Sequence, residues 1–188
     1  MLKKLLIIAS IFCLSVAAQD TTNMDEPYDG YGTGDGSRKN TSAPSGAYLG
    51  VGIGYLWNLD ANNPAYQAFL GKLWGVGDFF AVNLFAEGAT DFDNSWFIDG
   101  NLGFQFYPLP GYTVISPYLG IALGLGWATA TNLDNDKLGL NVVGTIGLRM
   151  FKNSPVGLTI EANVDWLTKD VVNDNNPVIV TGRIGIVF

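Results

Sequence analysis

The 188-residue sequence contains no histidine and a single cysteine, Cys13. The lack of histidine excludes Ser-His-Asp hydrolases, HExxH metalloproteases and other mechanisms that use histidine as general acid or base. Cys13 lies in an apolar segment that we expect to be removed, which leaves no disulfide and no cysteine-ligated metal. Charged residues make up only 14% of the chain, whereas soluble domains have about 25%. A large part of the surface must therefore tolerate having no charge.

The first 18 residues have the layout of a secretory signal peptide. Lys3 and Lys4 precede an uncharged apolar run over Leu5–Val16, and the small residues Ala17 and Ala18 follow. This run is short for a membrane-spanning helix, which needs about 20 residues. We expect cleavage after Ala18. Without the two lysines the net charge falls from −7 to −9, with 17 acidic residues, and this disfavours nucleic-acid binding.

Residues 19–46 contain little apolar surface and many Gly, Asp, Ser and Thr residues. Such a segment cannot bury enough surface to offset its chain entropy, so we predict a flexible periplasmic extension. Its DGYGTGDG stretch invites comparison with calcium-binding and phosphate-binding loops. No Gly-Lys-Ser/Thr follows, and the acidic spacing does not match an EF-hand. We interpret the stretch as a linker.

From Ala47 onward the composition changes to short segments in which apolar and small polar residues alternate, bounded by Asp, Asn, Pro or Gly. No window has a 3.6-residue apolar period, so essentially no helix is expected. The eight segments are 47–57, 65–74, 79–88, 96–107, 114–128, 138–151, 156–167 and 178–188. Their length and short connections predict an all-β fold, an eight-stranded antiparallel up-and-down transmembrane barrel over residues 47–188.

The two faces of the strands differ in charge. In the seventh segment, for example, Ile160 and Val164 alternate with Glu161 and Asp165. A water-soluble ligand-binding barrel and a membrane barrel both produce one charge-free face. In the soluble barrel the other face is solvated and should be rich in Lys and Glu. Here that face carries mainly Gly, Thr, Asn and Tyr, which fits a narrow lumen and favours the membrane barrel.

Four tryptophans occupy the charge-free face at the same predicted height, where an aromatic belt at the membrane interface is expected. They are Trp57, Trp96, Trp127 and Trp166. In the second segment, 65–74, the two faces are poorly separated, so its register is weakly specified. We place Lys72 of this segment in the lumen.

Three features resemble the small eight-stranded outer-membrane barrels, the family of the OmpA transmembrane domain and OmpX: the signal peptide, the stretch Ser116–Trp127 (SPYLGIALGLGW) and the aromatic end at Phe188. The resemblance covers residues 47–188. In that family, a C-terminal aromatic residue with alternating apolar residues before it looks like the signal read by the barrel-assembly machinery. Ile184, Ile186 and Phe188 match this pattern, whereas Gly182 lies one residue from the usual glycine position. The resemblance implies outer-membrane location, in contact with lipid and lipopolysaccharide, but no particular activity.

Ionisable residues on the lumen face should form a paired network, because an isolated buried charge costs several kcal/mol. If the last hairpin is symmetric about Val172, Glu161 faces Arg183, with Arg149 one or two rungs away. We interpret the network as a structural plug rather than a catalytic or metal site, and expect no cofactor. Its predicted members are Lys72, Glu87, Asp99, Arg149, Glu161, Asp165 and Arg183.

The connections at the tryptophan end are short and acidic: 58–64, 89–95, 129–137 and 168–177. Asp and Asn are common turn formers, so solvated turns explain them. Weak divalent-cation binding at this rim remains an alternative. The sequence thus predicts a structural or envelope-integrity outer-membrane protein that is not an enzyme. The alternative is a narrow porin-like pore or a barrel that binds a small ligand.

Overall fold

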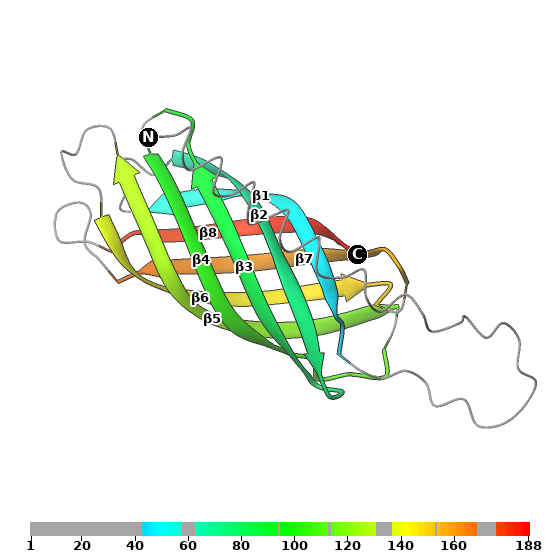
Figure 1. Ribbon diagram of the computed structural model, residues 1–188. Helices are drawn as coiled ribbons and strands as arrows, with labels where there is room; N and C mark the ends of the chain where they lie inside the picture. Colours follow the sequence, from blue (N-terminus) through cyan, green and yellow to red (C-terminus); the bar gives the residue numbers. More distant parts are fainter. Residues whose placement is uncertain are drawn as a thin grey trace, which may run out of the picture. The chain divides into compact units, whose positions relative to one another are not determined.

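The computed structural model describes residues 43–57, 63–93, 95–112, 114–130, 137–152, 154–168 and 176–188. Their strands form one closed antiparallel barrel, in which each strand pairs with its neighbours in the chain and β1 pairs with β8 (Figure 1). The strands are β1 (Gly46–Trp57), β2 (Asn63–Val76), β3 (Phe80–Thr90), β4 (Ser95–Phe106), β5 (Ile115–Ala130), β6 (Lys137–Met150), β7 (Gly157–Leu167) and β8 (Val178–Val187). The predicted fold class is confirmed, with every strand end within two residues of its predicted segment.

The described residues include no helix that is long and apolar enough to cross a bilayer. The predicted signal peptide and residues 19–42 of the predicted extension lie outside the described residues. Residues 43–46, also assigned to the extension, belong to the barrel instead. The backbone amide of Ala43 donates to the carbonyl of Gly77 at 2.9 Å, and that of Gly75 donates to Oγ of Ser45 at 2.8 Å.

We call the end of the barrel where β1 begins and β8 ends the terminal end, and the other end the distal end. Because side chains alternate along each strand, one set points outward and the next inward. On β7, Ile160 and Val164 are exposed whereas Glu161 and Asp165 are buried. The outward set of this strand is the charge-free face of the sequence pattern.

The prediction for Lys72 was wrong, because this residue lies on the outside of β2. Its register with Ala47 of β1 and Leu84 of β3 places it beside outward-facing Trp74, whose ring centroid is 5.8 Å from Nζ. The inward residues of β2 are instead the odd-numbered ones, including Gln67. Lys72 is near the terminal end, where a long stem can cover apolar surface while the ammonium group reaches water.

The outer surface has an aliphatic band around its middle. This band is the surface expected against hydrocarbon, with aromatic residues toward both ends at the depth of the lipid headgroups. It includes Leu49, Val51, Ile53, Leu102, Leu119, Ile121, Leu123, Leu140, Ile146, Leu148, Ile160, Val164, Ile184 and Ile186, all exposed. Toward the distal end lie Trp57, Trp96, Trp127 and Trp166, and toward the terminal end Trp74, Phe79, Phe80, Phe106, Phe151 and Phe188.

Candidate functional site

The interior of the barrel is divided into three layers along its axis. An apolar layer fills the distal end, with every member at most 1% exposed: Leu56, Ala65, Ala89, Phe97, Ala128, Leu167 and Ile179. A second apolar layer fills the terminal half and is dominated by aromatic rings: Tyr48, Phe69, Phe85, Tyr107 and Tyr118. On β4, the chain passes from Phe97 through Asp99 and Asn101 to Tyr107. The charged residues other than Arg149 therefore lie between these two layers.

Arg183 is at the centre of the charged layer. Its Nε and Nη2 donate to Oε2 of Glu161 at 3.0 and 2.6 Å, and its Nη1 pairs with Oε2 of Glu87. The guanidinium group lies 4.6 Å from the centroid of the Phe69 ring, a cation–π distance. All three charged side chains are at most 6% exposed. The network therefore links β3, β7 and β8 through one arginine.

Glu161 uses both of its carboxylate oxygens. Oε2 accepts from Arg183, and Oε1 accepts from the Tyr118 hydroxyl and from Oγ1 of Thr159, the latter at 2.9 Å. The strand register places Glu161 directly opposite Arg183, as the symmetric hairpin predicts. A buried ion pair thus connects β7 and β8 at this point of the register.

The sequence pattern also placed Arg149 near Glu161, and the structure does so on β6, opposite Thr159 of β7. Arg149 is 1% exposed and lies 5.6 Å from the centroid of the Tyr118 ring. None of its guanidinium nitrogens has a hydrogen-bond partner. Arg149 is therefore inside the barrel but outside the hydrogen-bonded network.

Glycines make room for the large side chains of the network. A Cβ atom on Gly52 of β1 would lie 2.9 Å from Cγ of Arg183, and one on Gly147 of β6 would lie 2.5 Å from the Tyr118 ring. Both distances are below van der Waals contact. Small residues on the inward face of β1 and β6 are thus a packing requirement of a narrow barrel.

Three carboxylates meet in the same layer. One oxygen each from Glu87, Asp99 and Asp165 lies within 4.8 Å of the other two, and Glu87 is the direct cross-strand neighbour of Asp99. Asp99 accepts from Nδ2 of Asn141, and Asp165 accepts from Nδ2 of Asn163 at 2.7 Å. The other oxygen of each of the three carboxylates has no hydrogen-bond partner.

These contacts leave an imbalance of charge in the lumen. Four carboxylates, Glu87, Asp99, Glu161 and Asp165, share the interior with the guanidinium groups of Arg149 and Arg183. If all six were ionised, two negative charges would be in excess. Two protons would neutralise this excess, and so would one divalent cation, which prefers oxygen ligands of this kind.

Several polar residues of the layer were not singled out from the sequence. Besides Asn141 and Asn163 they include Tyr118, Thr145, whose hydroxyl donates to Oδ1 of Asn163 at 2.6 Å, and Thr181, whose hydroxyl donates to Oε1 of Gln67 at 2.8 Å. These five residues and Gln67 occupy inward positions of their strands. Strand alternation could have identified them, whereas their partners depend on how the barrel closes.

At the distal rim, the structure describes Asp91 and Asp93 of the predicted acidic loops. Oδ1 of Asp91 accepts from the backbone amides of Asp93 and Ser95 at 3.1 and 2.8 Å, which is the turn-forming role of an aspartate. Asp60, Asp134, Asp136, Asp170 and Asp174 lie outside the described residues.

No protein-family model matches the chain, and no curated protein matches it in sequence. Among solved structures, the barrel is similar to Neisserial surface protein A, with a TM-score of 0.60 and 10% identity over 78% of this chain and 99% of that one. It is also similar to the N-terminal β-barrel domain of Pseudomonas aeruginosa OprF, with a TM-score of 0.51 and 14% identity over 78% and 99%. The chain therefore has the fold of the small eight-stranded outer-membrane barrels.

Proposed function

We propose that this protein is an integral barrel of the bacterial outer membrane with a closed lumen, and that its role is structural, in the integrity of the cell envelope. The observation that carries the proposal is the layered interior. The ionic layer around Arg183 lies between Leu56, Phe97, Leu167 and Ile179 on the distal side and the aromatic layer on the terminal side. In our proposal these two layers close the barrel to ions and solutes.

The outer surface supports the membrane location. An aliphatic band with aromatic residues at both ends is costly in water but suited to a bilayer, and the barrel has no open sheet edge. In our proposal the terminal end faces the periplasm and the tryptophans lie in the outer leaflet, in contact with lipopolysaccharide. Outward-facing Ile184, Ile186 and Phe188 would be read by the barrel-assembly machinery during insertion.

A non-catalytic role follows from the same interior. The Tyr118 and Thr159 hydroxyls both donate to Glu161, whose carboxylate is held by Arg183. A general base must be able to reach a substrate proton, whereas Glu161 is only 5% exposed and both of its carboxylate oxygens already accept hydrogen bonds. We therefore propose that the charged residues act in stability rather than catalysis.

Conductance of the purified protein in planar lipid bilayers tests the closed lumen. We expect no channel steps from the wild-type protein. A Phe97→Ala/Leu167→Ala variant, which thins the distal layer, is the matched control, and Leu123→Ala on the lipid face is a second control that should not change conductance. Reproducible steps from the wild-type protein would reject the closed lumen in favour of a narrow pore.

Fractionation tests the location separately. The mature protein should begin near Gln19 and be recovered with outer membranes, and detergent should be required to release it. Recovery as a soluble periplasmic protein would reject the membrane location and favour a ligand-binding barrel.

A further inference from the structure

Arg149 is a buried cation without a partner of its own. Its side chain is 1% exposed, and Nε, Nη1 and Nη2 all lack a hydrogen-bond partner. An arginine remains protonated under all ordinary conditions, and buried N–H donors of a charged group that have no acceptor are strongly unfavourable. The guanidinium group therefore lacks hydrogen-bond acceptors, which a bound ligand would supply.

Neighbouring side chains do not supply these acceptors, although Glu161 and Arg149 attract each other electrostatically. Both oxygens of Glu161 are already committed, Oε2 to Arg183 and Oε1 to Tyr118 and Thr159. The contact on the other side is the face of the Tyr118 ring, 5.6 Å away, and Tyr118 itself packs on Tyr107 at 5.4 Å. Aromatic faces attract a cation but do not neutralise it.

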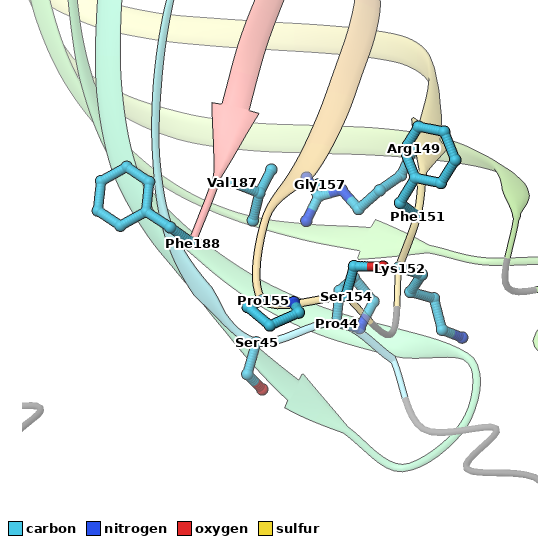
Figure 2. A pocket seen from close by; sticks show the side chains of 10 residues that line it. All are labelled: Pro44, Ser45, Arg149, Phe151, Lys152, Ser154, Pro155, Gly157, Val187 and Phe188. Carbon is cyan, nitrogen blue, oxygen red and sulfur yellow. The ribbon is translucent and has the colours of Figure 1, made fainter. Parts of the chain in front are cut away.

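Arg149 lines a cavity of about 210 Å³ at the terminal end of the barrel. The cavity lies among the β6–β7 turn, the end of β8 and the segment that leads into β1. In Figure 2, the guanidinium group of Arg149 points inward past Gly157, whereas the rings of Phe151 and Phe188 point away from it. The hydroxyl-bearing residues Ser45 and Ser154 are also in the lining. The cavity offers space for a small anion beside Arg149, whose buried guanidinium nitrogens would have to turn toward it.

Lys152 adds positive charge at the rim of this cavity. Its Nζ donates to the carbonyl of Pro110 at 3.0 Å, and in Figure 2 its amine points away from Arg149. Partial burial lowers the pKa of Lys152, an effect that the carboxylate of Asp78 opposes. Lys152 therefore contributes to the local field rather than to direct contact.

The depth of the cavity indicates the type of anion. Phe151 and Phe188, which line it, are 52% and 58% exposed and belong to the aromatic residues of the terminal end. Aromatic residues of this kind mark the headgroup region of a bilayer, where phosphodiesters are the abundant anions. The choice of a phosphodiester as the anion rests on the proposed membrane location. The observation that the Arg149 guanidinium group has no hydrogen-bond partner does not depend on that location.

We propose that the cavity at the terminal end binds a phosphoryl group, which Arg149 holds through its guanidinium nitrogens. Planar guanidinium groups match two phosphoryl oxygens at once, which a lysine cannot do. The phosphoryl group comes from a phospholipid headgroup or from free phosphate. Both sources offer the same two oxygens to Arg149, and the size of the attached group distinguishes them.

The test uses the folded full-length mature protein in a maltoside detergent, which contains no phosphorus. Inorganic phosphate and short-chain dihexanoylphosphatidylglycerol are titrated separately, with calorimetry and the urea midpoint as readouts and sodium chloride at equal ionic strength as the control. At least one ligand should bind and raise the urea midpoint of the wild-type protein. Arg149→Gln should weaken that binding by about tenfold or more, and Lys72→Gln, which removes an outer-surface cation, should leave it unchanged.

Each result decides the proposal. Binding of the phospholipid alone, of phosphate alone or of both, in each case dependent on Arg149, supports it and identifies the source. Absence of binding by both ligands overturns it, as does equal binding by wild type and Arg149→Gln. If Arg149→Gln does not fold, Arg149→Lys takes its place and should also weaken binding. Because the phosphate arm is carried out in micelles, its outcome does not depend on where the protein resides.

Discussion

Replacing Arg183 with methionine should be the most destabilising single change in the lumen. Arg183 holds Glu87 and Glu161 at once, and both carboxylates are nearly inaccessible to water. Without Arg183, four buried carboxylates would share the interior with Arg149 alone. Glu161→Gln has the opposite effect on the charge balance, because it leaves Arg183 paired with Glu87 and removes one of the excess negative charges.

These contacts give an order of magnitude for each change. Removing one partner of a buried ion pair costs about 3–5 kcal/mol, and Arg183→Met should lie at the upper end because two carboxylates lose their partner. Glu161→Gln loses charge-assisted hydrogen bonds worth about 1.5–3 kcal/mol. The double variant should lose less than the sum of the two, with a coupling energy of about 1–3 kcal/mol.

The measurement is a double-mutant cycle in lipid vesicles, with urea unfolding followed by tryptophan fluorescence. Thr181→Val is the matched control. It removes a neutral hydrogen bond to Gln67 two residues from Arg183 on the same strand, and should cost about 1 kcal/mol. The reasoning fails if Arg183→Met costs no more than Glu161→Gln, or if the two changes are additive.

Three further predictions concern the two faces and the end of the barrel. Ile146→Arg places a charge at an exposed position against lipid and should lower the free energy of unfolding in vesicles by about 2–4 kcal/mol. Thr145→Arg, at an inward-facing position, should avoid this lipid penalty. Equal losses in the two variants would contradict the assigned faces. Asp99→Asn and Asp165→Asn should each stabilise the protein by about 1 kcal/mol, because each change removes a negative charge beside Glu87. The stability is measured by urea unfolding with and without EDTA. If the variants are less stable and EDTA destabilises the wild type, the three carboxylates bind a cation instead. Phe188→Ala should reduce the heat-modifiable, folded fraction in outer membranes while leaving refolding from urea into vesicles unchanged; a loss only in vesicles would assign Phe188 to stability rather than assembly.

Local sequence pattern was sufficient for the strands and for most of their faces. A strand side chain points to the opposite side from its neighbour, so the alternation on β4, β6, β7 and β8 decides which residues face the lumen. Hairpin geometry is equally local. The expectation that the last hairpin is symmetric was enough to predict Glu161 opposite Arg183, as the pairing of β7 with β8 has it.

The same reasoning failed on β2, where both faces are mixtures of apolar and small polar residues. Charge alone assigned Lys72 to the lumen. The register with β1 and β3 turns Lys72 outward beside Trp74, since Gln67, Phe69 and Leu73 pack inside. Where alternation is weak, the neighbouring strands decide the face.

Contacts across the lumen were determined only by the closure of the barrel. Arg183 and Glu87 are 96 residues apart, and which inward side chains meet depends on the tilt and stagger of eight strands together. The sequence predicted seven charged residues in the interior, of which six lie there and Lys72 does not. It did not indicate that Arg183 pairs with both Glu87 and Glu161 while Arg149 has no hydrogen-bond partner. That distribution follows from the narrow interior of an eight-stranded barrel, where each guanidinium group can reach only the carboxylates brought to its own height.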